Sequence, residues 1–133
     1  MKSQPMTVEE FIFVMDRNPS IYPHYDALSD EQKRIMAHLN ICTGTAETFF
    51  DDQGRVFGVG GIRFVGMGEA WFITPPESRD MKLSLFREVS QQFKRIRDEK
   101  NLWRVFSESH ISENFLRHLG FEKQEGIHVW NRS

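Results

Sequence analysis

The chain has 133 residues, of which 39% are hydrophobic and 13% aromatic, and this content excludes an intrinsically disordered protein. Its formal net charge of -2 provides no basic surface of the kind that nucleic-acid binders use, so we expect no nucleic-acid partner. The length predicts a single domain, residues 1–133, large enough to bury a core of its own.

The cysteine content and the hydropathy pattern indicate the compartment. The single cysteine, Cys42, cannot form an internal disulfide, and no Cys/His cluster has metal-ligand spacing. The beginning of the chain, MKSQPMTVEEF, lacks the basic and then apolar order of a signal peptide. No apolar run approaches the roughly 20 residues of a membrane helix. We therefore expect a cytoplasmic protein with neither a metal nor a membrane partner.

Two helices are predicted at the start of the chain. Thr7 and Glu10 have the spacing of a capping box, and the helix that they open should end near Asn18 because Pro19 disfavours helical geometry in the residue before it. A second capping signal begins at Ser29. It precedes three apolar residues at helical spacing, namely Ile35, Met36 and Leu39.

An antiparallel three-stranded meander should follow. Residues 45–50, 55–65 and 69–74 have strand character, and the middle segment is interrupted by glycines that permit a bulge or close strand packing. The segment 51–54 has the Asp and Gly residues of a tight turn. Pro75 should end the third strand because it cannot donate to a ladder.

The last half of the chain predicts a helix, a strand, a helix and a strand. Residues 78–100 form a long amphipathic helix whose apolar stripe is Leu85, Phe86, Val89, Phe93 and Ile96. A strand is expected at residues 102–106, and Ser109 is a candidate cap for a short helix. Gly120 stands where a left-handed residue ends that helix, and residues 126–130 return as a final strand.

This order of elements, together with the segment NFLRHLGF at residues 114–121, resembles the GCN5-related N-acetyltransferase family. The resemblance implies a mixed α/β fold, with a central, mostly antiparallel sheet flanked by helices, and an acyl-CoA N-acyltransferase activity. A generic α+β domain of other connectivity is the alternative. More narrowly, GVGGIRFVGMGEAWFITPPESRD and SHISENFLRHLGF, with a Lys/Arg-rich helix between them, resemble the acetyltransferase-like internal virion proteins of podophages.

In the resembled family, the loop that opens the long helix holds the pyrophosphate of acetyl-CoA at free N–H groups. The family pattern is Arg or Gln, two residues, Gly, one residue, and Gly or Ala. The matching residues here, which are the cofactor-binding candidates, are Arg79, Asp80, Met81, Lys82, Leu83 and Ser84. Lys82 replaces the glycine, and its side chain could either crowd the diphosphate or pair with it. The sequence therefore leaves acetyl-CoA binding open.

The catalytic positions also depart from the family pattern. The family often places a Tyr on the short helix, where it protonates the leaving thiolate, and this chain has Leu116 there. Ser109 aligns with a frequent family Asn. Glu69 and Glu77 are positional candidates for the base that deprotonates the amine, although both also fit solvated carboxylates. The catalytic candidates are therefore Glu69 and Ser109.

The aromatic loop IYPHY, residues 21–25, joins the first two helices, which flank the acceptor side in the resembled fold. Its substrate-binding candidates are Tyr22, His24 and Tyr25. A loop that is pinned to the core by its rings is an equal alternative.

Two functions follow from the resemblance. The first is an acetyltransferase-like phage protein without catalysis, or with degraded activity, that acts through protein contacts in virion assembly or in the infected host. The second is an active acyl-CoA-dependent N-acyltransferase on an amine of unknown identity. We favour the first because Lys82 and Leu116 alter two motifs at once.

Overall fold

The computed structural model describes residues 2–64, 68–74, 83–107, 113–124 and 127–132. The helices are α1 (Val8–Arg17), α2 (Asp30–Cys42), α3 (Leu83–Glu99) and α4 (Glu113–His118), and two short 3-10 helices, η1 (Pro19–Ile21) and η2 (Tyr25–Ala27), lie between α1 and α2. The strands are β1 (Lys2–Pro5), β2 (Gly44–Phe50), β3 (Val56–Arg63), β4 (Glu69–Ile73), β5 (Arg104–Ser107), β6 (Glu122–Gln124) and β7 (Ile127–Asn131).

The first two helices begin at the predicted capping boxes. Thr7 Oγ1 accepts from the Glu10 N–H at 3.2 Å, and the Glu10 carboxylate accepts from the Thr7 N–H at 2.9 Å. Ser29 and Gln32 make the same reciprocal pair at the start of α2, at 3.1 and 2.8 Å. Each box satisfies N–H groups that a helix leaves without an internal partner.

Within the described residues the strands form one seven-stranded sheet with the order β1-β2-β3-β4-β5-β7-β6. The predicted meander of β2, β3 and β4 is confirmed, with antiparallel pairing at both junctions. β4 and β5 are parallel neighbours, and their register joins Glu69 to Phe106. β1 and β6 were not predicted, because four and three mostly exposed residues carry no periodic apolar signal.

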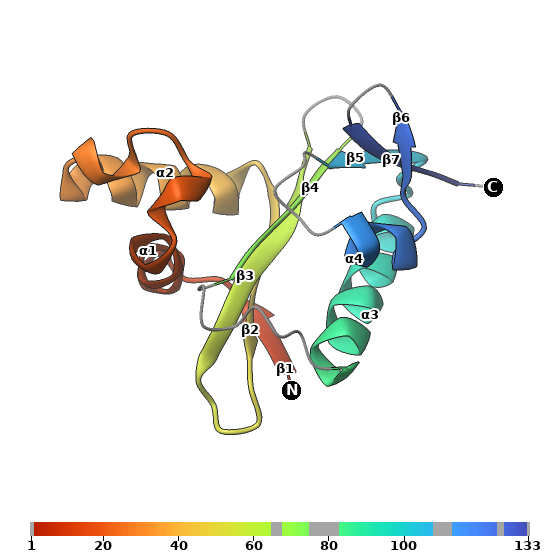
Figure 1. Cartoon of the computed structure of the whole chain (residues 1–133), viewed down its shortest axis with the longest axis horizontal. Helices are drawn as coiled ribbons and strands as arrows, with labels where there is room; N and C mark the ends of the chain where they lie inside the picture. Colours follow the sequence, from red (N-terminus) through yellow and green to blue (C-terminus); the bar gives the residue numbers. More distant parts are fainter. Residues whose placement is uncertain (1, 65–67, 75–82, 108–112, 125–126, 133) are drawn as a thin grey trace.

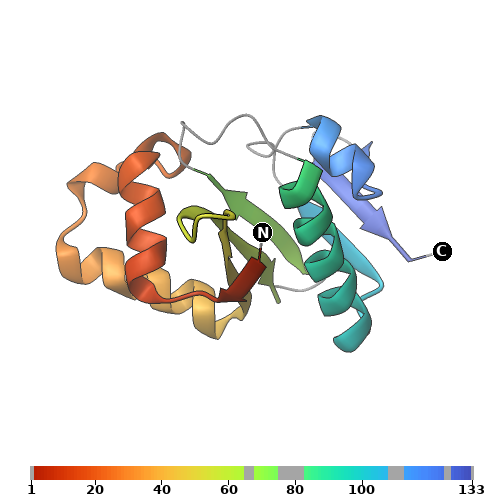
Figure 2. The same ribbon diagram turned by 90° about the horizontal axis from the view of Figure 1, so that it is seen from below.

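Helices cover both faces of the sheet. α1 and α2 lie on one face, and α3 and α4 lie on the other (Figures 1 and 2). Side chains of β4 alternate between the two layers: Trp71 and Ile73 pack beneath α1 and α2, whereas Phe72 packs beneath α3. This mixed α/β architecture, with a mostly antiparallel sheet flanked by helices, confirms the predicted fold class.

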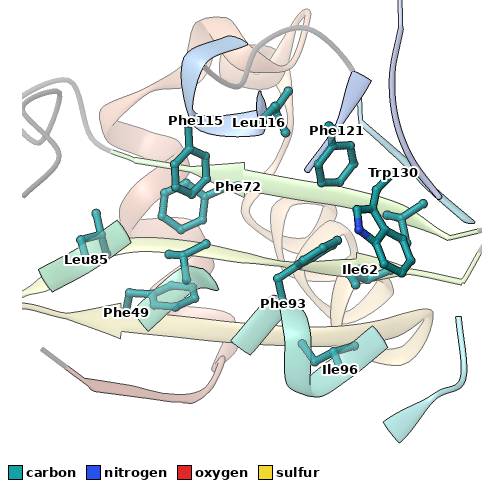
Figure 3. Close-up of a cluster of buried hydrophobic side chains, with 12 residues drawn as sticks. Phe49, Ile62, Phe72, Leu85, Phe93, Ile96, Phe115, Leu116, Phe121 and Trp130 are labelled. Carbon is teal, nitrogen blue, oxygen red and sulfur yellow. The ribbon is translucent and has the colours of Figure 1, made fainter. Parts of the chain in front are cut away.

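The α3 face is closed by an aromatic core (Figure 3). The α3 stripe is buried as predicted at four positions, namely Leu85, Val89, Phe93 and Ile96. Two residues beyond the end of α4, Gly120 has φ +95°. Its N–H donates to the Arg117 carbonyl and the Phe121 N–H donates to the Leu116 carbonyl, both at 3.0 Å. These two bonds are the Schellman arrangement that satisfies helix carbonyls.

Of the three apolar residues predicted at helical spacing in α2, Met36 is partly buried against the core, and the other two are exposed. Ile35 and Leu39 are 51% and 57% exposed, whereas Ala37 and Asn40 face the sheet and are buried. Ile35 and Leu39 are therefore largely exposed, whereas Met36 and Ile41 are partly buried against the core.

The described residues were also compared with the requirements of a membrane-spanning helix and of a metal site. Within the described ranges, no helix is both long enough and apolar enough to cross a bilayer. In the same part of the chain, no group of three or more His, Cys, Asp or Glu side chains could hold a metal ion.

Candidate functional site

A cleft of about 590 Å³ lies between the α1 and α2 layer and the strands β3 and β4. Its walls include three large apolar side chains that remain about half exposed, namely Tyr22, Ile35 and Leu39. Apolar clefts of a few hundred Å³ with a small number of converging polar groups are the usual form of ligand sites. We therefore take this cleft as the candidate functional site.

The floor of the cleft carries a polar cluster centred on Arg63. Arg63 Nη1 lies 2.7 Å from Glu69 Oε1, and Arg63 Nε donates to Asn40 Oδ1 at 2.8 Å. Its guanidinium carbon lies 5.2 Å from the centre of the Trp71 ring. The cluster joins α2, β3 and β4, because Arg63 and Glu69 oppose each other across the strand pair.

Trp71 has a buried and unpaired indole donor. Its side chain lines the cleft and is only 3% exposed, and its Nε1 has no hydrogen-bond partner in the described structure. The ring packs edge-on against Phe11, with centroids 6.2 Å apart. A buried donor without a partner costs about 1–3 kcal/mol of folding free energy.

The three predicted substrate-binding residues have different surroundings. Tyr22 lines the cleft, whereas His24 lies exposed in the connecting loop with a left-handed φ of 64°. Tyr25 is buried in the core, and its hydroxyl donates to Asp16 at 3.1 Å. Burial and the Asp16 carboxylate raise the pKa of Tyr25 above its usual range. The loop therefore contributes Tyr22 to the cleft and Tyr25 to the core.

The remaining predicted site residues divide into two groups. Glu69 lines the cleft on the floor of the α1 and α2 face. Leu83 and Ser84 are the first two residues of α3. The other predicted positions lie outside the described residues, and these are Arg79, Asp80, Met81, Lys82 and Ser109, together with Glu77.

The other face of the sheet holds a smaller cavity, of about 50 Å³, beneath α3 and α4. Leu116, which takes the position of the family's catalytic Tyr, lines this cavity and is 1% exposed. The titratable side chain in the lining is Glu47, whose carboxylate pairs with Arg95 at 3.3 Å. Burial raises the pKa of Glu47, and the Arg95 guanidinium opposes that shift.

Sequence reasoning did not identify Arg63, Trp71 and Asn40 as site residues. Strand alternation places Glu69 and Trp71 on one face, and the meander brings Arg63 opposite Glu69. That pattern could have indicated a polar cluster in a strand pair that is otherwise apolar. The contribution of Asn40 had no such signal, because it comes from α2, 23 residues away from Arg63 in the sequence.

Comparison with known proteins identifies the fold. No protein-family model matches the chain, and no curated protein matches it. A spermidine N-acetyltransferase SpeG chimera from Vibrio cholerae and hSSAT superimposes with a TM-score of 0.76 and 10% identity, and the match covers 98% of this chain and 96% of that chain. The ribosomal-protein-S5-alanine acetyltransferase from Vibrio fischeri gives a TM-score of 0.66 with 11% identity, over 97% and 91% of the two chains.

A third structure of this fold contains coenzyme A. The PaiA N-acetyltransferase from Thermoplasma acidophilum, in complex with coenzyme A, matches with a TM-score of 0.68 and 12% identity, over 98% of each chain. At such low identities these likenesses establish the fold alone. The chain therefore has the fold of the N-acetyltransferases.

Proposed function

We propose that this chain is an acetyltransferase-like protein that does not transfer acyl groups and that acts by binding a protein partner. The observation that carries the proposal is the burial of Leu116 in the apolar core of α3 and α4. The resembled family uses a Tyr at this position to protonate the leaving thiolate, and a leucine side chain has no proton to give. Loss of a general acid typically costs a factor of about 10²–10⁴ in rate.

The described surroundings of Leu116 are mostly apolar, and the polar side chains that line the same cavity are Glu47, which pairs with Arg95, and Gln92. The neighbours of Leu116 in the α3-side core are Phe72, Phe93 and Phe115. Phe115 packs against both Phe72 and Phe86, with ring centroids 6.2 and 5.5 Å apart. A protonated carboxyl or a phenol in this position would need a polar partner that these rings cannot supply.

The cleft on the opposite face supports a binding role. Tyrosine side chains such as Tyr22 are enriched at protein interfaces, and adjoining exposed apolar side chains mark interaction surfaces. The sequence resemblance to internal virion proteins of podophages supports a setting in virion assembly or in the infected host. The partner would then be a virion protein or a host protein.

An active acyl-CoA-dependent N-acyltransferase is the second candidate. Two observations favour it: Glu69 lies in the cleft as a carboxylate that could accept an amine proton, and the PaiA protein of the same fold holds coenzyme A. Positioning of two reactants can by itself supply several kcal/mol of rate enhancement, so a missing acid would slow such an enzyme without abolishing it.

Calorimetric titration of the full chain with acetyl-CoA separates the two candidates. We expect no saturable heat at millimolar cofactor, and no release of free thiol when amines and acetyl-CoA are supplied together. Tight binding that Lys82→Glu abolishes, accompanied by thiol release, would overturn the proposal. Lys94→Glu is the matched control because Lys94 makes the same charge change at an exposed position of α3.

A further inference from the structure

Trp103 has the most exposed large apolar side chain of the described residues, at 65%. It lies in the connection between α3 and β5. Its carbonyl accepts from the Arg132 N–H at 2.9 Å, which extends the pairing of β5 with β7 by one residue beyond the strands. Single exposed apolar residues are common on protein surfaces, so the exposure of this ring is informative only together with its surroundings.

Two arginine side chains connect this ring to the core. The guanidinium carbon of Arg132 lies 5.6 Å from the centre of the Trp103 ring and 5.8 Å from that of the Trp130 ring. The guanidinium carbon of Arg97 lies 4.5 Å from the centre of the Trp130 ring. Guanidinium groups within about 6 Å of a ring centre are attracted to the ring. Because Trp130 is buried, this row of rings and guanidinium groups ties Trp103 to the interior.

The Arg132 side chain is itself held in place. Its Nε donates to the Leu102 carbonyl at 2.9 Å, and its Nη2 donates to the Arg97 carbonyl, in the last turn of α3, at 3.0 Å. Its Nη1 lies 3.6 Å from Asp98 Oδ1. A cation at the C-terminal end of a helix is also stabilised by the helix dipole. The support of the Trp103 ring is therefore formed before a partner binds, and such preorganisation lowers the entropy cost of binding.

The charges around Trp103 are mostly positive. In residues 95–104 and at position 132, the five cations are Arg95, Arg97, Lys100, Arg104 and Arg132, and the two carboxylates are Asp98 and Glu99. Both carboxylates are bound to arginines, Asp98 to Arg132 and Glu99 to Arg95 at 3.1 Å. Five cations and two carboxylates give this region, which we call the Trp103 surface, a net charge of +3, whereas the whole chain has -2.

Charge complementarity favours an acidic polypeptide segment on the Trp103 surface. Carboxylates of such a segment meet a net positive charge, and an apolar side chain among them covers the ring. A nucleic acid fits less well, because Nε and Nη2 of Arg132 donate to main-chain carbonyls and its guanidinium is not free for a bidentate grip on a phosphate. The net charge of the chain also opposes a long polyanion.

We infer that the partner protein docks on the Trp103 surface through an acidic segment that carries an apolar side chain. That side chain packs on the exposed part of the Trp103 ring, and the flanking carboxylates lie beside Arg132 and the exposed Lys100. Tryptophan and arginine are the side chains most enriched among interface anchors. This inference rests on the proposed function, since it names the chemistry and the docking place of the protein partner.

A ¹H–¹⁵N spectrum of the labelled full chain follows binding at the Trp103 indole N–H, which Trp103→Ala assigns by its loss. The probe is acetyl-Glu-Glu-Leu-Leu-Glu-Glu-amide, and two comparison peptides carry Gln or Lys in place of Glu. We expect the acidic peptide to move the Trp103 resonance saturably, with a dissociation constant on the order of millimolar because the probe is small. Binding should weaken as the salt rises from about 50 to about 500 mM. The Gln and Lys peptides should give no saturable shift.

Two variants, each with a matched control, test the surface, and binding to them is followed at the backbone amide of Asn101. Trp103→Ala should weaken binding of the acidic peptide by at least about tenfold because it removes the anchor. Phe13→Ala is its control, since Phe13 is also exposed and also has an arginine over its ring, at 4.2 Å. Lys100→Glu should weaken binding by at least about fivefold. Lys2→Glu makes the same charge change on β1, which three strands separate from β5. Both controls should keep the affinity within about twofold, because neither lies on the Trp103 surface.

Several results would overturn the inference. These are the absence of a saturable shift with the acidic peptide, equal affinity for the acidic and the Gln peptides, and equal affinity of Trp103→Ala and Phe13→Ala for the acidic peptide. A single-stranded oligothymidylate that binds at the Trp103 resonance more tightly than the acidic peptide would overturn it in favour of a nucleic-acid surface. Each of these failures leaves the absence of acyl transfer intact, because that proposal is tested separately by acetyl-CoA binding and thiol release.

Discussion

Arg63 Nη1 lies 2.7 Å from Glu69 Oε1, across the strand pair of β3 and β4, and both side chains are partly buried. The same guanidinium also donates to Asn40 Oδ1 of α2 and stacks over the Trp71 ring. Arg63 is therefore the side chain through which the sheet and α2 are joined at the floor of the cleft.

Loss of this guanidinium should destabilise the fold. Arg63→Met leaves the partly buried Glu69 carboxylate without its partner, so we expect the free energy of unfolding to fall by about 1–3 kcal/mol in urea denaturation. Arg55→Met is the control, because it removes an exposed pair with Asp51 that should contribute less than about 1 kcal/mol. Equal losses of unfolding free energy in the two variants would show that the Arg63 cluster does not help to hold α2 against the sheet.

Leu116 should behave as a core residue. Leu116→Tyr must fit a larger ring and a hydroxyl beside a cavity of about 50 Å³, so we expect a loss of about 1–3 kcal/mol in unfolding free energy and no gain of thiol release. Arg117→Tyr, at the next and exposed position of α4, should change stability by less than about 0.5 kcal/mol. A Leu116→Tyr protein with unchanged stability would contradict the packing described for α4.

Gly60 of β3 leaves room for the Phe72 ring. A Cβ at position 60 would lie 2.5 Å from Phe72 Cδ2 and 2.8 Å from the Trp71 carbonyl oxygen. Gly60→Ala should therefore lower the midpoint of thermal unfolding, with a loss of about 1–3 kcal/mol. Adding Phe72→Leu to Gly60→Ala should cost less than the sum of the two single changes. Additive losses of unfolding free energy would show that the added Cβ does not clash with the Phe72 ring.

Tyr25 should make the protein sensitive to alkaline pH. Burial and the Asp16 carboxylate raise the pKa of Tyr25 in the folded state, so the unfolded chain loses this proton first as the pH rises. The stabilising contribution is complete below the unfolded pKa of about 10 and declines above it. Urea midpoints measured from pH 8 to 11 should fall more steeply in the parent protein than in Tyr25→Phe. Parallel curves would contradict the buried Tyr25–Asp16 hydrogen bond.

The sequence by itself determined the elements whose signals are local. The capping boxes at Thr7 and Ser29 set the starts of α1 and α2, and the left-handed Gly120 ends α4. The apolar stripe of α3 predicted its buried face, because a helix repeats every 3.6 residues whatever it packs against. At the described ends, the predicted bounds of β2, β3, β4, β5 and β7 agree with the structure to within two residues.

The candidate site was predicted only in part. Tyr22 and Glu69 were named from the sequence and both line the cleft, although their roles stay predictions. Tyr25 has the same kind of side chain as Tyr22 and lies three residues away, yet it is buried against Asp16. No local property of the loop distinguishes Tyr22 from Tyr25. Which of the two rings is buried depends on which one the core has room for.

Only the tertiary structure decided what the cleft contains. Ile35 and Leu39 have the spacing of a buried helix face, yet the buried residues of α2 are Ala37 and Asn40, and Asn40 Oδ1 accepts from Arg63 Nε of the sheet. The unpaired Trp71 donor likewise depends on what surrounds it and not on its place in β4. Such features are set by contacts between residues far apart in the chain, whereas helix starts and periodic faces are set by residues within a few positions of one another.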